Sequence, residues 1–272
     1  MLVAEFGSRY NGIQDMYSDK DLLIVGTEWS NITEYSLRYE LSGYSVSPFL
    51  ESRALYLSSQ GSLFFKHIIN ESSVICDKHK FLKKIKNTWE PRHNYNSEIE
   101  SNIELLELLK YKPKTIHSLN FVNDLLIISI RNILIRKIAE QGQYVFGWDQ
   151  IFKTSVRLGF LKERDIEVLK ISKKLKNAYR SNVYLNISGS FIDEVLNIGS
   201  YILNQKLKIG RENEKQVLKS PETYQENSYK QLRALEFLCS HYSFDKSLSG
   251  YIKLIKKPNY TCSTKSLTSA ST

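Results

Sequence analysis

Residues 6–26, FGSRYNGIQDMYSDKDLLIVG, constrain the fold of this chain more than any other stretch. A Gly-Ser pair, Gly7-Ser8, follows an apolar run, and Gly12 comes shortly after it. Residues 18–21, Ser-Asp-Lys-Asp, then lead into the aliphatic run 22–25, which is bounded by a glycine. A short aliphatic run with such a boundary predicts a buried strand. The stretch therefore predicts a turn rich in small residues that delivers two acidic side chains to the start of a core strand.

The spacing of the two acids has a physical meaning. Residues two apart in a strand point to the same side, so Asp19 and Asp21 should project together and Lys20 to the opposite face. Two neighbouring carboxylates suit Mg²⁺, which proteins hold by one or two carboxylates together with substrate phosphates. Gly7 would allow the backbone to approach a phosphate closely, and Ser8 would add a hydroxyl donor. This is the equipment for moving a nucleotidyl or phosphoryl group.

The pattern resembles the signature of the DNA polymerase β-like nucleotidyltransferases, in particular the minimal and aminoglycoside nucleotidyltransferases. That signature is a Gly-Ser pair, a nearby Gly, then Ser-Asp-x-Asp and a hydrophobic strand; here GSRYNG and SDKDLL are separated by five residues. The resemblance implies Mg²⁺ and a nucleoside triphosphate, most simply ATP. The implied catalytic residues and metal ligands are Asp19 and Asp21, and the implied nucleotide-binding residues are Gly7, Ser8, Arg9 and Ser18. The plain alternative is a surface turn followed by a charged strand edge.

One position departs from the family pattern. The next predicted strand, 44–50, contains a proline, which indicates an edge strand or a strand end. The resemblance implies a third carboxylate in this strand, which joins the metal site and can deprotonate the acceptor, but the matching position holds Ser47. Glu51 would share a face with Ser47 by alternation. The family also carries a helix before the first strand, which this sequence lacks. His67, in a predicted helix over 62–70, is interpreted as a partly buried surface histidine, with a catalytic or metal role as the alternative.

The predicted fold class is α+β, with a small mixed-sheet domain over residues 1–90 followed by an all-α helical bundle over 97–257. A polar stretch near residues 90–97 is the linker candidate. Beyond it, apolar residues recur at three- and four-residue steps. The predicted helices of this half are 98–111, 115–141, 148–158, 163–181, 188–208 and 229–242. Residues 258–272, rich in Ser and Thr, are predicted to be a disordered tail.

The helical half carries a second resemblance, to the HEPN helical domain, which often accompanies minimal nucleotidyltransferases. HEPN ribonucleases use an Arg, a polar residue and a His a few positions on. The matching stretch, KKLKNAYRS, holds Lys176 in place of the Arg and has no His. Arg233 and His241 are spaced too widely to replace them. The resemblance thus implies a non-nucleolytic domain suited to binding or to homo-oligomerisation, and an unrelated helical bundle is the alternative.

Charge and composition narrow the partners and the compartment. The net charge is +9; residues 1–90 hold 10 Lys and Arg against 11 Asp and Glu, and residues 91–272 hold 28 against 18. A basic helical half would suit a polyanionic acceptor such as RNA, although lysines interspersed with glutamates also serve solubility. Three widely spaced cysteines indicate a reducing compartment and show no metal-binding spacing. No signal peptide opens the sequence and no apolar run approaches the length of a membrane span, so we expect a cytoplasmic protein.

The leading hypothesis is a Mg²⁺-dependent nucleotidyltransferase that moves a nucleoside monophosphate from a triphosphate to an acceptor hydroxyl. RNA or a partner protein is the favoured acceptor and a small molecule such as an aminoglycoside the other. Toxin–antitoxin and phage-defence systems are typical settings of the resembling pair of domains. The alternative is a degenerate nucleotidyltransferase that senses nucleotide or RNA, or acts as an antitoxin. A ribonuclease based on the helical half is disfavoured by the missing Arg and His.

Overall fold

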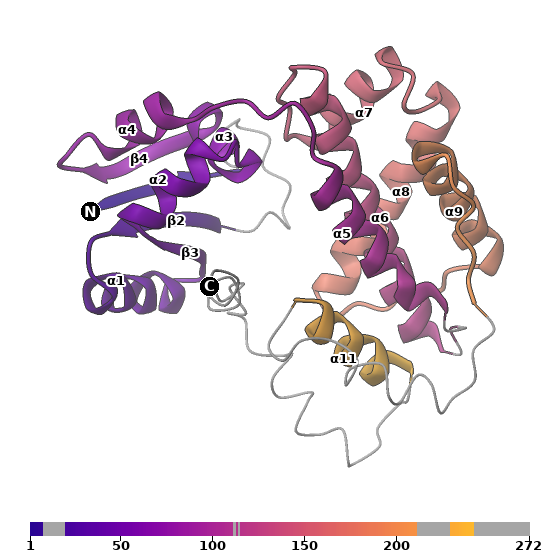
Figure 1. Cartoon of the computed structure of the whole chain (residues 1–272). Coiled ribbons are helices and arrows are strands. Elements are labelled where there is room, and N and C mark those ends of the chain that lie inside the picture. The colour runs from indigo at the N-terminus through magenta and orange to yellow at the C-terminus, as the bar shows by residue number, and fades with distance from the viewer. Residues whose placement is uncertain (8–19, 111–112, 114, 211–228, 242–272) are drawn as a thin grey trace, which may run out of the picture. The chain divides into compact units, whose positions relative to one another are not determined.

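The computed structural model describes residues 1–7, 20–110, 113, 115–210 and 229–241, and it has the predicted α+β class. The chain forms two compact units, each described here by itself (Figure 1). We call Met1–Tyr95 with Lys137–Ile151 the sheet unit, and Asn96–Arg136 with Phe152–Thr272 the helical unit. A small mixed sheet followed by a helical region is compatible in general shape with the resemblance drawn from residues 6–26.

The sheet has four strands in the order β3-β2-β1-β4. The strands are β1 Leu2–Phe6, β2 Lys20–Gly26, β3 Tyr44–Leu50 and β4 Ser72–Asp77. β1 runs antiparallel to both β2 and β4, whereas β2 and β3 are parallel. β3 is an edge strand, as its Pro48 predicts. Proline has no backbone N–H to donate to a neighbouring strand, so it is found mainly in edge strands.

Helices cover both faces of this sheet, and β2 is buried between them. Leu22 and Ile24 pack with Ile32 of α1 (Trp29–Leu41) on one face. Leu23 and Val25 face the other side, where α2 (Glu51–Ser59), α3 (Leu63–Asn70) and α4 (Phe81–Thr88) supply the core. All four β2 residues are fully buried. This accounts for an unbroken apolar run rather than an alternating one, since both faces of the strand meet helices.

The segment 137–151 completes the sheet unit through contacts with α3 and the chain after α4. The Glu140 carboxylate accepts a hydrogen bond of 2.7 Å from the backbone N–H of Tyr95. The Lys66 ammonium lies 4.3 Å from the ring centre of Trp89 and 4.9 Å from that of Tyr144. Burial, and then the charge of a nearby lysine, lower the pKa of Lys66. Aromatic and cation–π contacts therefore bring this segment back to the sheet unit.

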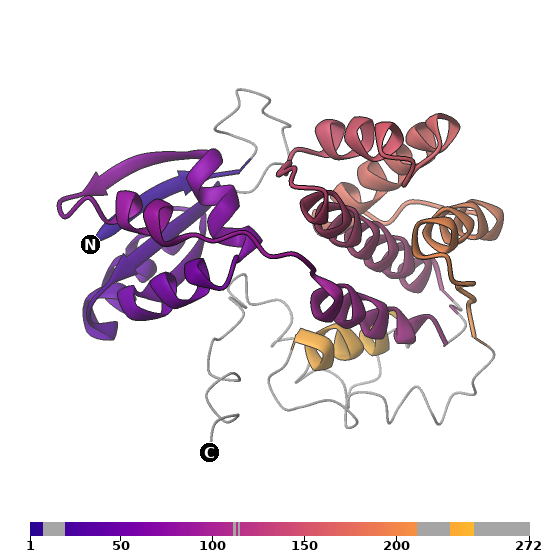
Figure 2. The same cartoon turned by 45° about the horizontal axis from the view of Figure 1, so that its top comes forward.

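The helical unit is built around one long apolar helix, α6 (Ile116–Glu140). The other helices described are α5 Asn96–Leu105, η1 Leu106–Lys110, α7 Trp148–Arg157, η2 Glu163–Asp165, α8 Ile166–Arg180, α9 Gly189–Leu203 and α11 Tyr229–His241. In Figures 1 and 2, α6 runs through the middle of the unit with α5, α8 and α9 around it. Its length and hydropathy alone would suffice to cross a membrane, but 78% of the apolar window is buried inside the protein. α6 is thus a core helix. The predicted tail, 258–272, lies outside the described residues.

Candidate nucleotide site on the sheet unit

One end of the sheet carries the described part of the predicted site. Ser72, Phe6, Asp21 and Ser45 are register partners in a row that crosses all four strands. Phe6 belongs to the core on the α2–α4 face, and Asp21 shares that face because it lies two residues before the core residue Leu23. The strand pairing therefore presents the Asp21 carboxylate on the α2–α4 face, directly beside the end of β1.

Gly7 follows the last residue of β1 and lies against that carboxylate. Its φ is +91°, a backbone conformation that residues other than glycine rarely adopt. A Cβ atom at Gly7 would lie 3.2 Å from Oδ2 of Asp21, closer than most such contacts. Glycine is thus required here twice, by backbone conformation and by the approach of the carboxylate. The result is an acidic oxygen next to a buried glycine backbone at a strand end.

Gly7 and Asp21 are the two predicted site residues that the structure describes, and it brings them together. Ser8, Arg9, Ser18 and Asp19 lie outside the described residues. Within the described ranges, no group of three or more His, Cys, Asp or Glu side chains could hold a metal ion. The donor chemistry of Asp21 beside a glycine backbone fits a magnesium-bound phosphate, which needs few protein ligands.

The position of the implied third carboxylate can be followed along β3. Ser47 pairs with Leu23 and so lies on the face of Asp21, two residues further along the strand. Glu51 is the first residue of α2 rather than a continuation of the strand. Its neighbour Leu50 pairs with Gly26, about 16 Å along β2 from Asp21 at 3.3 Å per residue. Glu51 therefore lies at the opposite end of the strand pair, and the β3 residues on the face of Asp21 near it are Ser45, its register partner, and Ser47.

His67 of α3 lies at the same end of the sheet as Asp21. Its ring meets the Phe6 ring edge-on, with 5.7 Å between centres, and stacks on Phe146 at 4.4 Å. Its Nε2 atom is 3.3 Å from Oε2 of Glu71, and the two side chains are only 17% and 14% exposed. The sequence analysis did not place this pair in the site. The available signal was the four-residue spacing of His67 and Glu71 at a helix end, directly before β4.

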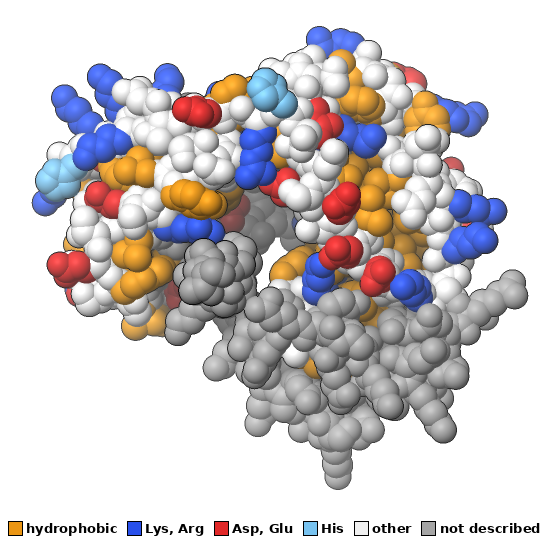
Figure 3. Space-filling view, viewed as in Figure 1, with side chains coloured by type: hydrophobic (Ala, Val, Ile, Leu, Met, Phe, Trp, Pro, Cys, Tyr) orange, Lys and Arg blue, Asp and Glu red, His pale blue; other side chains and the backbone are white. Residues whose placement is uncertain are grey.

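The sheet unit also carries a basic surface around α4. We call it the α4 lysine surface: five exposed lysines, none with an acidic partner among the residues the structure describes, namely Lys78, Lys80, Lys83, Lys84 and Lys86. Figure 3 shows blue side chains gathered over α4 at the upper left. The amides at the start of α4 are already bound by Asp77, which accepts from Phe81 N–H at 2.6 Å and Leu82 N–H at 3.0 Å. The positive field here therefore comes from the lysines.

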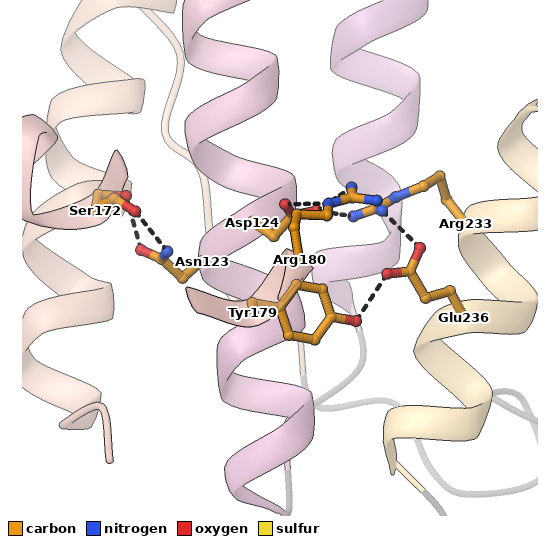
Figure 4. Close-up of polar contacts among 7 residues, drawn as sticks. All are labelled: Asn123, Asp124, Ser172, Tyr179, Arg180, Arg233 and Glu236. Carbon is orange, nitrogen blue, oxygen red and sulfur yellow. Dashed lines mark hydrogen bonds and ion pairs between the residues drawn. The ribbon is translucent and has the colours of Figure 1, made fainter. Parts of the chain in front are cut away.

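A second polar cluster lies inside the helical unit (Figure 4). Asp124 of α6 is fully buried and accepts two hydrogen bonds from Arg180, at 2.8 and 2.6 Å, and one of 2.5 Å from Arg233. Arg233, only 1% exposed, also donates to Glu236 at 2.6 Å, and Tyr179 donates to Glu236 at 2.7 Å. Two arginines and two carboxylates neutralise one another. We call these five residues the buried charge network.

Electrostatics within the buried charge network keep Asp124 and Arg233 ionised. Burial alone would raise the pKa of Asp124, but the charges of Arg233 and Arg180 outweigh it and lower the pKa. Burial likewise opposes the charge of Arg233, and Glu236 and Asp124 reverse this and raise its pKa. Burial and the charge of Glu236 raise the pKa of Tyr179 well above 10.0. The network holds α6, α8 and α11 together, and it leaves Arg233 engaged by carboxylates rather than available to an RNA phosphate.

Comparison of the chain with protein families, with characterised proteins and with solved structures finds no match. The function is therefore argued from the groups gathered at the end of the sheet.

Proposed function

We propose that this protein is a nucleotidyltransferase that moves a nucleoside monophosphate from a nucleoside triphosphate to an acceptor hydroxyl. The observation that carries the proposal is the contact between Gly7 and Asp21: a positive-φ glycine at the end of β1 lies against a carboxylate of β2. Strand pairing thus joins the two halves of the signature that the sequence spaces apart.

Each residue has a part that follows from its position. Asp21, together with Asp19 of the predicted pair, would hold Mg²⁺, which when bound neutralises phosphate charge and orients the leaving group. Gly7, which has no side chain, would let a phosphate oxygen come close to its backbone, and Ser8, Arg9 and Ser18 are the predicted further phosphate contacts. Catalysis of this kind consists of positioning and charge stabilisation rather than covalent chemistry by the protein.

The α4 lysine surface supports a polyanionic acceptor, and among those named above it favours RNA. Like charges three and four residues apart on a helix destabilise it by a few tenths of a kcal/mol per pair. Lys80, Lys83 and Lys84 form such pairs and have no compensating acid among the described residues. A nucleic-acid backbone would compensate all of them at once.

Transfer is tested with purified protein, Mg²⁺, each labelled nucleoside triphosphate and total RNA. We expect label on RNA from the wild type, and a loss of at least 100-fold in Asp21→Asn. Asp193→Asn, an exposed carboxylate change on α9, is the matched control and should transfer at the wild-type rate. Absence of both label transfer and triphosphate binding in the wild type would refute the proposal.

The acceptor surface is tested separately by the salt dependence of RNA binding. The double variant Lys83→Gln/Lys84→Gln should reduce the slope of log affinity against log salt by about 1.4 for a single strand, at ~0.7 per phosphate contact. Lys153→Gln/Lys174→Gln, two exposed lysines of the helical unit, should leave the slope unchanged. Equal slopes in all three proteins would place the acceptor elsewhere.

A second candidate is a nucleotide sensor without transferase activity. Ser47 favours it, because a serine stands on the face of Asp21 where the resemblance implies the carboxylate that deprotonates the acceptor. Triphosphate binding that Asp21→Asn weakens, without label transfer to RNA, protein or small molecule, would select the sensor.

A further inference from the structure

We propose that His67, held by Glu71, accepts the proton of the attacking hydroxyl and so replaces the carboxylate that Ser47 lacks. This inference rests on the proposed nucleotidyl transfer and assigns the residue that completes it.

His67 lies beside Phe6, the residue that pairs with Asp21. Phe6 pairs with Asp21 across the antiparallel strands, and the same Phe6 ring meets the His67 ring at 5.7 Å between centres. Paired residues on one face lie about 5 Å apart. Asp21 and His67 are thus both neighbours of Phe6 on the α2–α4 face, at the end of the sheet where Gly7 follows β1. Among the described residues, His67, Glu71 and Asp21 do not form a group that could hold a metal ion.

Two aromatic rings and a carboxylate surround the His67 imidazole. Phe146 stacks on one face of the imidazole with an interplanar angle of 22°, and Phe6 meets it at 89°. Because Glu71 lies 3.3 Å from Nε2, the other nitrogen, Nδ1, is the one left to accept a proton. Within the described residues, His67 has no other polar partner. A base fixed by two rings and a carboxylate has the arrangement of an oriented catalytic histidine.

The proposed reaction transfers the nucleoside monophosphate to the acceptor and one proton to His67. The acceptor oxygen forms a bond to the α-phosphorus of the triphosphate while the bond from that phosphorus to the bridging oxygen breaks, and pyrophosphate leaves. The hydroxyl proton moves to Nδ1 of His67, and the carboxylate of Glu71 stabilises the imidazolium. Of the charged groups around His67, Glu71 contacts its Nε2 atom and Asp21 lies on the same face beside Phe6. Lys66 of the same helix lies against Tyr144 in the segment that carries Phe146.

The kinetic test compares His67→Gln with His79→Gln, a matched change at an exposed histidine before α4. We expect His67→Gln to lower kcat by 100-fold or more, in the range of general-base effects, with triphosphate Kd within twofold of wild type. The wild-type pH–rate profile should have an acid limb, and this limb should vanish in His67→Gln. Glu71→Gln should reduce kcat and keep the limb. His79→Gln should match wild type throughout.

A binding measurement gives a readout that does not depend on turnover or on a variant that folds. In wild-type protein with isotope-labelled histidine, the ring nitrogen signals of His67 should shift when Mg²⁺ and an α,β-methylene triphosphate are added, and those of His79 should not. Unmoved His67 signals in a protein that binds the analogue, or a His67→Gln variant with unchanged kcat and pH profile, would overturn this inference alone. A wild type that neither binds the analogue nor transfers label would overturn the proposed function with it.

Discussion

Replacing Asp124 by Asn should destabilise the helical unit strongly, because it removes the charge on which two arginines converge. Asp124 is fully buried and accepts three hydrogen bonds of 2.5 to 2.8 Å from Arg180 and Arg233. An Asn keeps one acceptor oxygen and turns an N–H₂ group toward guanidinium donors. Arg233, at 1% exposure, would retain only Glu236 as a charged partner.

The magnitude follows from the exposure of each partner. Breaking a buried ion pair by removing one member costs about 3–5 kcal/mol, since the other charge stays buried. The side chain of Arg180 is 43% exposed and can turn to water, so its loss adds little. Arg233 cannot, and we expect a loss of about 3 kcal/mol in the free energy of unfolding. For a unit of this size that corresponds to a drop of roughly 6–12 °C in Tm.

The chain offers a convenient assay because Trp29, Trp89 and Trp148, its three tryptophans, all belong to the sheet unit. Tryptophan fluorescence therefore follows the sheet unit, while far-UV circular dichroism is dominated by the helices. Urea unfolding of Asp124→Asn should shift the dichroism transition much more than the fluorescence transition. Asp193→Asn, exposed on α9, is the control and should shift either by less than about 0.5 kcal/mol.

The same variant has a pH signature. The lowered pKa of Asp124 means that its stabilising effect is complete above the unfolded-state pKa, about 3.9, and is lost as pH falls through the folded-state value. The stability gap between wild type and Asp124→Asn should therefore be constant near neutral pH and narrow below about pH 4. A variant as stable as Asp193→Asn at neutral pH would refute the reasoning.

Three further outcomes are expected. Gly61→Ala should lose about 2 kcal/mol in the tryptophan-fluorescence transition, because φ is +68° and a Cβ would lie 2.7 Å from the carbonyl oxygen of Glu90. Gly7→Ala should weaken triphosphate binding in equilibrium titrations tenfold or more, since its Cβ would press on Asp21. Burial raises the pKa of Cys239 to about 11, so its alkylation, followed by peptide mass spectrometry, should rise about tenfold per pH unit from pH 8 to 10 and be far faster in urea.

Local pattern was enough to predict most elements of the fold. β3 has the predicted bounds, because it is a short run of strand-forming residues between turn-forming residues. α2 was missed: Glu51 looked like the end of a strand, and nothing in residues 51–59 shows a strong helical stripe.

The candidate site divides in the same way between local and long-range information. Gly7 and Asp21 could be predicted because a motif fixes their spacing, and pairing of β1 with β2 follows from it. The His67–Glu71 pair is local in sequence, but its place beside Phe6 depends on the packing of α3 against the sheet, which a single sequence does not specify. The buried charge network includes Asp124 and Arg233, which are 109 positions apart in the sequence. No local sequence pattern predicts such a pair.

The electrostatic field of a segment depends on whether its Lys and Arg side chains have acidic partners, and not only on how many there are. The sequence assigns its excess of Lys and Arg to residues 91–272, yet Arg180 and Arg233 in that half are held by Asp124 and Glu236 and contribute little field outside. Residues 1–90 are nearly neutral in total, but the α4 lysine surface within them has no acidic partners among the described residues. A polyanion responds to the local, uncompensated field and not to the sum over a segment. Gly7, Asp21 and the α4 lysine surface thus belong to one unit, which fits the proposed RNA acceptor.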